Sequence, residues 1–269
     1  MIPYIDVPPI HLGPFVIYLF GVFASLAVVS GHLWMLGRAK RTGLDPSIVN
    51  GMAFWVFLVG FPVSVVVKWF YYPDFLVTLW TAPGELFRGG FVMSSFGGVI
   101  GGLAGGIGFL MATGQRNLAL WRYVDVIAWA FPRAFIFGRL GCSVAHDHPG
   151  IRTASLLGVQ YPGGTRYDLG VLEVFFLLLL VGFIALLDRP KRPAGFFLGV
   201  FLAMYGAFRF ALDSLHEAPP AYFGISVDHW FGGAAFVIGL IVLMKARRQP
   251  QPAGPRAETT AKARRAFSQ

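Results

Sequence analysis

Seven apolar segments, each close to the ~20 residues that span a bilayer core, constrain this chain more than any other feature. They lie roughly at residues 14–36, 48–68, 91–112, 120–140, 169–187, 195–212 and 226–245. Hydrophobic residues make up 56% of the sequence and charged residues only 13%, about half the charged share of a soluble domain. The sequence therefore predicts an all-α integral membrane protein with about seven transmembrane helices.

Basic residues predict how these helices are oriented. Lysine and arginine follow the first, third, fifth and seventh segments, and the loops between the other segments contain few of them. Because cytoplasmic loops carry the excess of Lys and Arg, we expect the N-terminus outside and the C-terminus in the cytoplasm. The same distribution accounts for the net charge of +9 without nucleic acid as a partner. Residues 1–246 are predicted to form the transmembrane domain, and the basic tail at 247–269 to be disordered.

Two of the segments predicted to lie outside are too long to be simple turns. Residues 69–90 are rich in aromatic side chains, as is typical at the level of lipid headgroups. Residues 141–168 are rich in glycine, proline and polar residues, which favours a loop. Because long ordered loops are often functional, we expect two extracytoplasmic loop or arm regions.

The third apolar segment contains glycines at regular spacing. Gly97, Gly101 and Gly105 are four residues apart and share one helix face. The spacing predicts close packing of this helix against a neighbouring one.

Two arginines interrupt the apolar segments at positions where a charge needs a partner. Arg139 lies between Gly138 and Gly141, and Arg209 stands four residues before Asp213 on the same helix face. A guanidinium keeps its charge at ordinary pH, so within a membrane it must meet an anion, water or the lipid interface. Arg209 and Asp213 are either a structural ion pair, or Asp213 orients Arg209 toward a phosphate. The second interpretation is favoured, because charged residues inside membranes are usually functional.

A dense group of titratable residues follows Arg139, namely Cys142, His146, Asp147 and His148. Two histidines two residues apart can be metal ligands, but the sequence places no third ligand convincingly, so no metal is expected. A general base near neutral pH is the functional alternative, and a polar loop held by hydrogen bonds is the structural one. A lone cysteine in an apolar setting is more often a small packing residue than a nucleophile.

These residues, taken together, resemble the prolipoprotein diacylglyceryl transferase family, in order, up to about Met244. G-R-L-G-C-S is similar to the family's Gly-Arg-x-Gly-Asn-Phe signature, which places the essential arginine at Arg139. Gly150 stands where the family has a glycine, and R-Y-D-L-G-V-L-E keeps a family glutamate as Glu173. Y-G-A-F-R-F-A-L-D is similar to Tyr-Gly-x-x-Arg-x-x-x-Glu and maps the second functional arginine to Arg209. Three positions depart from the family pattern: Phe20 replaces a tyrosine, Phe96 a histidine and Cys142 an asparagine.

The resemblance implies transfer of a diacylglyceryl group from phosphatidylglycerol to the lipobox cysteine thiol of a prolipoprotein, with glycerol phosphate as the leaving group. The implied catalytic residues are Arg139 and Arg209, with His146 or His148 as the base. The implied substrate-binding residues are Arg139, Gly141, Gly150, Glu173 and Asp213. The partners are phosphatidylglycerol, a signal peptide and membrane lipid, and neither cofactor nor metal is expected. The implied location is the bacterial inner membrane, with the active site facing the outer leaflet.

The alternative hypothesis is a non-catalytic protein that binds or moves lipid on the same scaffold. It is supported by the three departures from the family pattern, because phenylalanine cannot act as a base. A small-solute transporter is a weaker idea, since the sequence shows neither an internal repeat nor paired broken helices.

Overall fold

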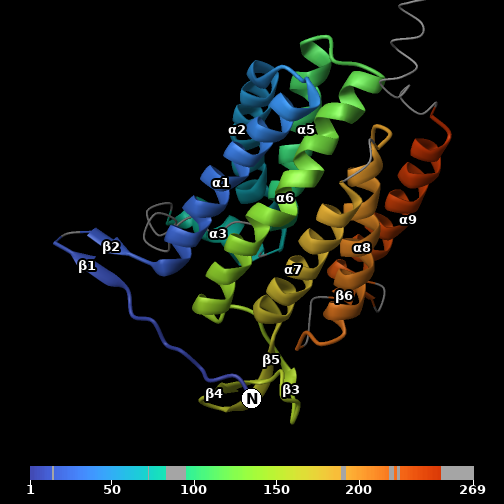
Figure 1. The fold of residues 1–269 in the computed structure, drawn as a ribbon. Coiled ribbons are helices and arrows are strands. Elements are labelled where there is room, and N and C mark those ends of the chain that lie inside the picture. The colour runs from blue at the N-terminus through green and yellow to red at the C-terminus, as the bar shows by residue number, and fades with distance from the viewer. Residues whose placement is uncertain are drawn as a thin grey trace, which may run out of the picture. The chain divides into compact units, whose positions relative to one another are not determined.

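The computed structural model describes residues 1–13, 15–71, 73–82, 95–188, 192–217, 221–222 and 225–249 (Figure 1). The chain divides into two compact units, one made of Met1–Gly31 and Val124–Gln269 and the other of His32–Tyr123. In chain order the elements are β1 (Ile10–Leu12), β2 (Phe15–Ile17), α1 (Leu19–Thr42), α2 (Pro46–Tyr71), α3 (Pro73–Thr81), α5 (Ser95–Ala112), α6 (Leu118–Ala145), β3 (Pro149–Arg152), β4 (Val159–Tyr161), β5 (Gly164–Asp168), α7 (Leu169–Leu187), α8 (Phe196–Asp213), β6 (Ala221–Tyr222), β7 (Ile225–Ser226) and α9 (Val227–Arg247).

The described residues of the seven apolar segments lie on helices, except that the first segment begins with β2, and the mostly helical character of the chain is confirmed. Within the described residues, five helices are long and apolar enough to cross a membrane, namely α1, α2, α7, α8 and α9. The described part of α5 is shorter, and α6 carries several charged residues. The chain is therefore an integral membrane protein, while the number of crossings and the sides of the termini stay predictions.

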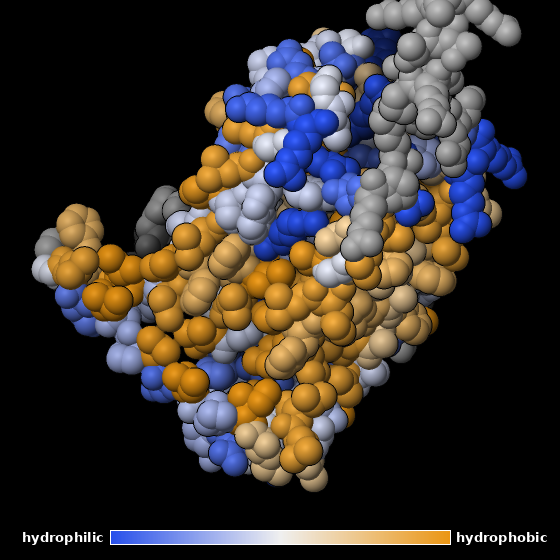
Figure 2. Space-filling view, in the orientation of Figure 1, coloured by the Kyte–Doolittle hydropathy of each residue, from blue (hydrophilic) through white to orange (hydrophobic). Residues whose placement is uncertain are grey.

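The surface of α7 is suited to lipid rather than water. Phe175, Leu178, Leu179 and Leu186 are each at least half exposed, and Leu179 is 74% exposed. Figure 2 shows apolar side chains gathered over this helix. A water-soluble protein rarely exposes so continuous an apolar face, so this side of α7 is expected to face acyl chains.

Glycines allow α8 and α9 to approach each other backbone to backbone. A Cβ added at Gly206 would lie 2.5 Å from the backbone N of Phe236, and one at Gly239 would lie 2.3 Å from that of Ala203. Both distances are far shorter than any van der Waals contact, so only glycine fits at these positions. The pair α8–α9 forms the framework that carries Arg209 and Asp228.

In the unit His32–Tyr123, the predicted glycine packing is confirmed. A Cβ at Gly101 would lie 2.6 Å from the Cβ of Val63, and one at Gly105 would lie 2.3 Å from the carbonyl oxygen of Trp55. The glycine column of α5 therefore packs directly on α2, as small-residue columns do in membranes.

The prediction of a loop over residues 141–168 is wrong. Helix α6 continues to Ala145, and the chain then forms a three-stranded antiparallel sheet in the order β3-β5-β4. Tyr161 pairs with Gly164 across the β4–β5 turn, where Gly164 has a φ of 116° that favours glycine. The N-terminal segment joins this sheet through a bridge between Ile2 and Val159. The structure also places helix α3 within residues 69–90, where a loop was expected.

Some expectations lie outside the described residues. They concern the disorder of the tail beyond Gln249, the rest of the segment at 69–90, the side chain of Phe96, and the basic residues Arg189 and Lys191.

Candidate active site

Three helices bring two arginines to one buried carboxylate. Glu173, on α7, is completely buried. The Nε of Arg139, on α6, lies 3.0 Å from Oε2 of Glu173, and Nη1 of Arg209, on α8, lies 3.4 Å from the same oxygen. The structure thus brings together Arg139, Arg209 and Glu173, which are far apart in the sequence.

Tyr205 completes the surroundings of this carboxylate. Its hydroxyl donates a hydrogen bond of 2.5 Å to the other carboxylate oxygen, Oε1 of Glu173. Burying a charged carboxylate is costly unless it is paired and hydrogen-bonded, and here both oxygens have partners. Sequence reasoning missed Tyr205, although its position four residues before Arg209 places it on the same helix face.

Arg139 is buried next to Glu173 and Cys142. The residue is only 7% exposed, and its Nη1 donates a long hydrogen bond of 3.9 Å to Sγ of Cys142. Its Nε lies 3.0 Å from the carboxylate of Glu173, which compensates part of its charge. A guanidinium has five N–H donors, so Arg139 has further donors with which it can bind an anion.

Arg209 has a second acid partner that faces outward. Its Nη2 donates a hydrogen bond of 2.6 Å to Oδ2 of Asp228, in the first turn of α9. The side chain of Asp228 is 40% exposed, unlike the buried Glu173. An exposed carboxylate is the easier of the two for an incoming anion to replace.

The predicted ion pair between Arg209 and Asp213 is wrong. Asp213 instead accepts a hydrogen bond from the hydroxyl of Ser226, and its Oδ2 lies 2.5 Å from Nδ1 of His229. Ser226 is the N-cap of α9, where its hydroxyl also accepts from the backbone N–H of His229. Asp213 therefore joins the end of α8 to the start of α9. The spacing of four residues would allow Asp213 to contact Arg209, but the structure pairs Asp213 with residues of α9 and its N-cap.

His146 is held by groups on both sides of its ring. Nδ1 lies 3.0 Å from Oδ2 of Asp168, and Nε2 lies 3.3 Å from the carbonyl oxygen of Ile5. The ring stacks on Tyr4 with centroids 4.0 Å apart. Both ring nitrogens therefore face groups of the protein itself. His146 fixes the N-terminal segment to the sheet.

His148 lies beside Cys142 and Asp147 instead. Its Nδ1 is hydrogen-bonded to Oδ1 of Asp147, and the side chain is 32% exposed. The hydrogen bond to Asp147, followed by that to Cys142, raises the pKa of His148 to about 9. At neutral pH the imidazole is therefore protonated and adds positive charge next to Arg139. A role for His146 or His148 as general base stays a prediction.

The two glycines predicted to bind substrate lie at close backbone contacts. A Cβ at Gly141 would be 3.1 Å from the ring of Phe20, on α1. At Gly150 it would be 2.6 Å from the carbonyl oxygen of Leu215. Both glycines let neighbouring elements pack closely, so their effect on substrate is expected to be indirect.

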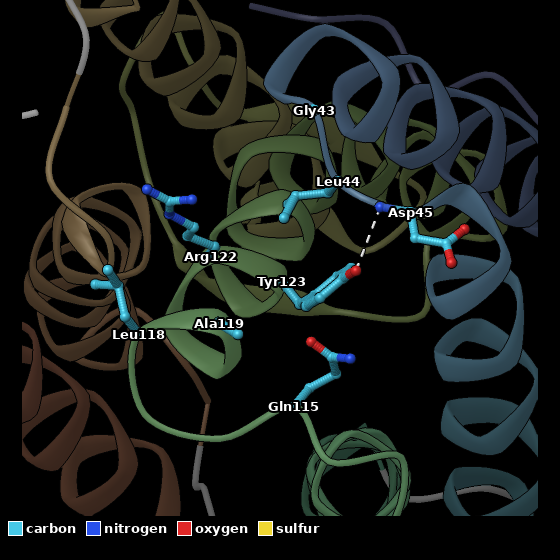
Figure 3. A pocket seen from close by; sticks show the side chains of 8 residues that line it. All are labelled: Gly43, Leu44, Asp45, Gln115, Leu118, Ala119, Arg122 and Tyr123. Atoms are coloured by element: carbon cyan, nitrogen blue, oxygen red, sulfur yellow. Dashed lines mark hydrogen bonds between the residues drawn. The ribbon is translucent and has the colours of Figure 1, made fainter. Parts of the chain in front are cut away.

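A separate cavity of about 480 Å³ lies in the unit His32–Tyr123 (Figure 3). The backbone N–H of Asp45 donates a hydrogen bond of 3.3 Å to the hydroxyl of Tyr123 at its wall. None of the predicted site residues lines it. Its lining residues are Gly43, Leu44, Asp45, Gln115, Leu118, Ala119, Arg122 and Tyr123.

The fold and the site define a helical membrane protein in which two arginines converge on one buried carboxylate. Comparison with known proteins makes the class specific. A family model described as prolipoprotein diacylglyceryl transferase matches residues 9–245, and the chain belongs to this family.

Relatives named phosphatidylglycerol–prolipoprotein diacylglyceryl transferase match along most of their length. The protein of Symbiobacterium thermophilum is 25% identical, with 94% of this chain and 97% of the relative covered. That of Chromohalobacter salexigens is 31% identical, with 93% and 96% covered. That of Leifsonia xyli is 30% identical, with 87% and 76% covered.

Proposed function

We propose that this chain transfers a diacylglyceryl group from phosphatidylglycerol to the lipobox cysteine thiol of a prolipoprotein. Membership of the transferase family and the names of the relatives support this activity. The structural observation that carries it is the convergence of Arg139 and Arg209 on one side of Glu173. No cofactor is part of this proposal.

The reaction requires an anion to be stabilised where the phosphate departs. The thiolate sulfur attacks the glyceryl carbon, the carbon–oxygen bond breaks, and the electron pair stays on the phosphate oxygen of glycerol phosphate. Guanidinium groups bind phosphate through paired N–H donors. The electrostatic attraction between the two groups is stronger in a site of low dielectric. We assign headgroup and leaving-group binding to Arg139 and Arg209. The burial of Arg139 and the exposed partner Asp228 of Arg209 support this assignment.

Glu173 acts in this proposal as the fixed counter-charge of the two arginines. It keeps both guanidinium groups close together while no phosphate is bound. Because its carboxylate is fully buried and bonded to Tyr205, it stays in place when phosphate arrives. Asp213 has a more distant role, since it positions α9 and thereby Asp228.

The thiol is expected to enter at the end of α6, beside His148 rather than His146. His148 lies with Cys142 and Asp147 next to Arg139, whereas His146 is occupied by Asp168 and Ile5. The thiol would then attack from the side of His148, and glycerol phosphate would leave beside the neighbouring Arg139. The location that fits these substrates is the bacterial inner membrane, with the site facing the outer leaflet.

Rescue of a bacterium depleted of its own transferase separates this proposal from a non-catalytic lipid-binding protein. We expect the wild-type chain to restore growth and lipoprotein modification, and Arg209→Ala to restore neither. Arg133→Ala is a matched control, because Arg133 also lies on a helix of the same unit but contacts Trp129. Failure of a normally expressed wild-type chain to restore modification would contradict the activity.

A further inference from the structure

The cavity in the unit His32–Tyr123 lies where helices of this unit end and begin (Figure 3). Its walls come from the connection between α1 and α2, at residues 43–45, and from Gln115 and the first turns of α6. Because α1 and α2 are both apolar enough to cross a membrane, we expect their short connection at the level of the lipid headgroups. The volume of about 480 Å³ falls within the range of about 300–1,000 Å³ that is usual for ligand sites.

Hydrogen-bond donors line this cavity. Tyr123 is only 4% exposed, and its hydroxyl accepts a hydrogen bond of 3.3 Å from the backbone N–H of Asp45. A hydroxyl that accepts one hydrogen bond can still donate its own hydrogen, and among the described residues no acceptor takes it. Arg122 and Gln115 add N–H donors to the lining (Figure 3). The cavity therefore offers more donors than acceptors.

The charges around the cavity suit an anion. Asp45 is the acidic residue of the lining, and its Oδ1 accepts a hydrogen bond of 2.8 Å from the backbone N–H of Ser47 in the first turn of α2. This carboxylate is thus engaged at the start of a helix. Exposed basic residues flank the lining on both sides, namely Lys40 and Arg41 at the end of α1 and Arg116 before α6. Clustered charges of one sign raise the local concentration of the opposite ion.

We propose that this cavity binds the phosphate of an anionic phospholipid, through donors from Arg122, Tyr123 and Gln115. The lipid comes from the leaflet at this membrane face, which the basic residues predict to be cytoplasmic. Leu44 and the 48% exposed Leu118 also line the cavity and provide an apolar surface. Such a surface suits the glycerol and the first acyl carbons of a lipid, which a free phosphate ion lacks.

This binding site is independent of the transferase activity. Neither Arg139 nor Arg209 lines the cavity, and both belong to the other compact unit. A lipid bound here would contact the α1–α2 connection and the start of α6 together. Because a ligand that binds only the folded state stabilises it, this lipid should also raise the temperature at which the chain unfolds.

The test is native mass spectrometry of the full chain in detergent, titrated with phosphatidylglycerol. Each bound lipid adds its mass, so the binding steps are resolved one by one. Arg122→Ala should weaken one step by about 10-fold or more, as for the loss of one hydrogen bond to a charged group. Tyr123→Phe keeps the ring but removes the hydroxyl, and it should weaken the same step by a similar factor. Circular dichroism checks that both variants are folded.

Arg248→Ala is the matched control. Arg248 is also an exposed arginine at the end of an apolar helix, but it lies outside the cavity. Its binding steps should equal those of the wild type, and a lipid held by Arg139 and Arg209 should be counted equally in all these chains. Unchanged binding in folded Arg122→Ala would overturn the site. Equal weakening in Arg248→Ala would overturn it too, because surface charge alone would then attract the lipid.

Two further probes identify the ligand. Phosphatidylcholine has a phosphate but no net charge, and we expect it to bind the wild-type chain about 10-fold more weakly or worse at this step, with no effect of Arg122→Ala. Inorganic phosphate should not displace phosphatidylglycerol when both are at equal concentration. Equal affinity for phosphatidylcholine would overturn the selection of an anionic lipid, and displacement by inorganic phosphate would assign the cavity to the free ion instead.

Discussion

Glu173 is the residue on which the charge of the site depends. It is the single fully buried carboxylate that both Arg139 and Arg209 approach among the described residues. Without it, two permanent cations would face each other in a poorly solvated place. With it and Asp228, the group is close to neutral and can accept a phosphate without excess repulsion.

Replacing Glu173 should therefore destabilise the protein strongly. Glu173→Gln keeps the shape but leaves two guanidinium groups without their shared counter-charge, and breaking a buried ion pair costs about 3–5 kcal/mol. Tyr205→Phe removes one hydrogen bond to the same carboxylate and should cost less, about 1.5–3 kcal/mol. Equilibrium unfolding in mixed micelles measures both. Equal stability of Glu173→Gln and wild type would show that the buried carboxylate does not hold the arginines.

At this scale the sequence predicted the important residue types but not their partners. Arg139 and Arg209 stand out because a guanidinium in an apolar helix needs an anion. The sequence indicates a partner only through spacing along a helix, which predicts Asp213 as the partner of Arg209. In the structure Asp213 contacts Ser226 and His229 instead. The true partner, Glu173, is separated from Arg139 by 34 positions, which local spacing does not encode. Likewise Cys142 was interpreted as a packing residue, because its approach to His148 depends on the turn after α6.

Among the elements, α8 and α9 depend on single glycines for their close approach. Gly206 and Gly239 lie where any side chain would overlap the facing backbone. This contact fixes the distance between Arg209, on α8, and Asp228, on α9.

Gly239→Ala should separate these helices. The added methyl group overlaps backbone atoms of α8, and overpacking costs typically about 1–3 kcal/mol. Gly182→Ala is the matched control on α7, where nothing lies within 4 Å of the new Cβ. Its effect should be neutral or slightly stabilising, because alanine is the better helix former. Thermal unfolding of both variants tests the difference, and a Gly239→Ala variant as stable as Gly182→Ala would argue against close helix contact.

The elements that the sequence predicted well are the long apolar helices. Their hydrophobicity determines them almost alone, and each of the seven segments overlaps a helix of the described structure. The sheet β3-β5-β4 was missed, because its strands are only three to five residues long. Short strands without apolar alternation give no periodic signal. The end of α6, from residue 141 to Ala145, was missed, because its glycine and polar residues are also typical of a loop.

For the whole molecule, the distribution of basic residues makes a prediction about orientation in the membrane. In a Cys142→Ser background, Gly163→Cys reports the β4–β5 turn and Thr42→Cys reports the end of α1. Because Arg38, Lys40 and Arg41 belong on the cytoplasmic side, a membrane-impermeant thiol reagent should label Gly163→Cys in intact cells. Thr42→Cys should be labelled only after the membrane is opened. The opposite labelling pattern would place the arginine site on the wrong side for exported prolipoproteins.

The central claim is that Arg139 and Arg209 hold the phosphate of the lipid while the thiolate attacks the glyceryl carbon. The most direct measurement is mass spectrometry of a lipobox peptide incubated with the full chain in vesicles that contain phosphatidylglycerol. We predict a diacylglyceryl thioether with the wild-type chain, an undiminished rate with Arg133→Ala, and rates at least about 100-fold lower with Arg139→Ala or Arg209→Ala, as for the loss of one charge-stabilising donor. Wild-type rates from folded Arg139→Ala and Arg209→Ala proteins would contradict the claim.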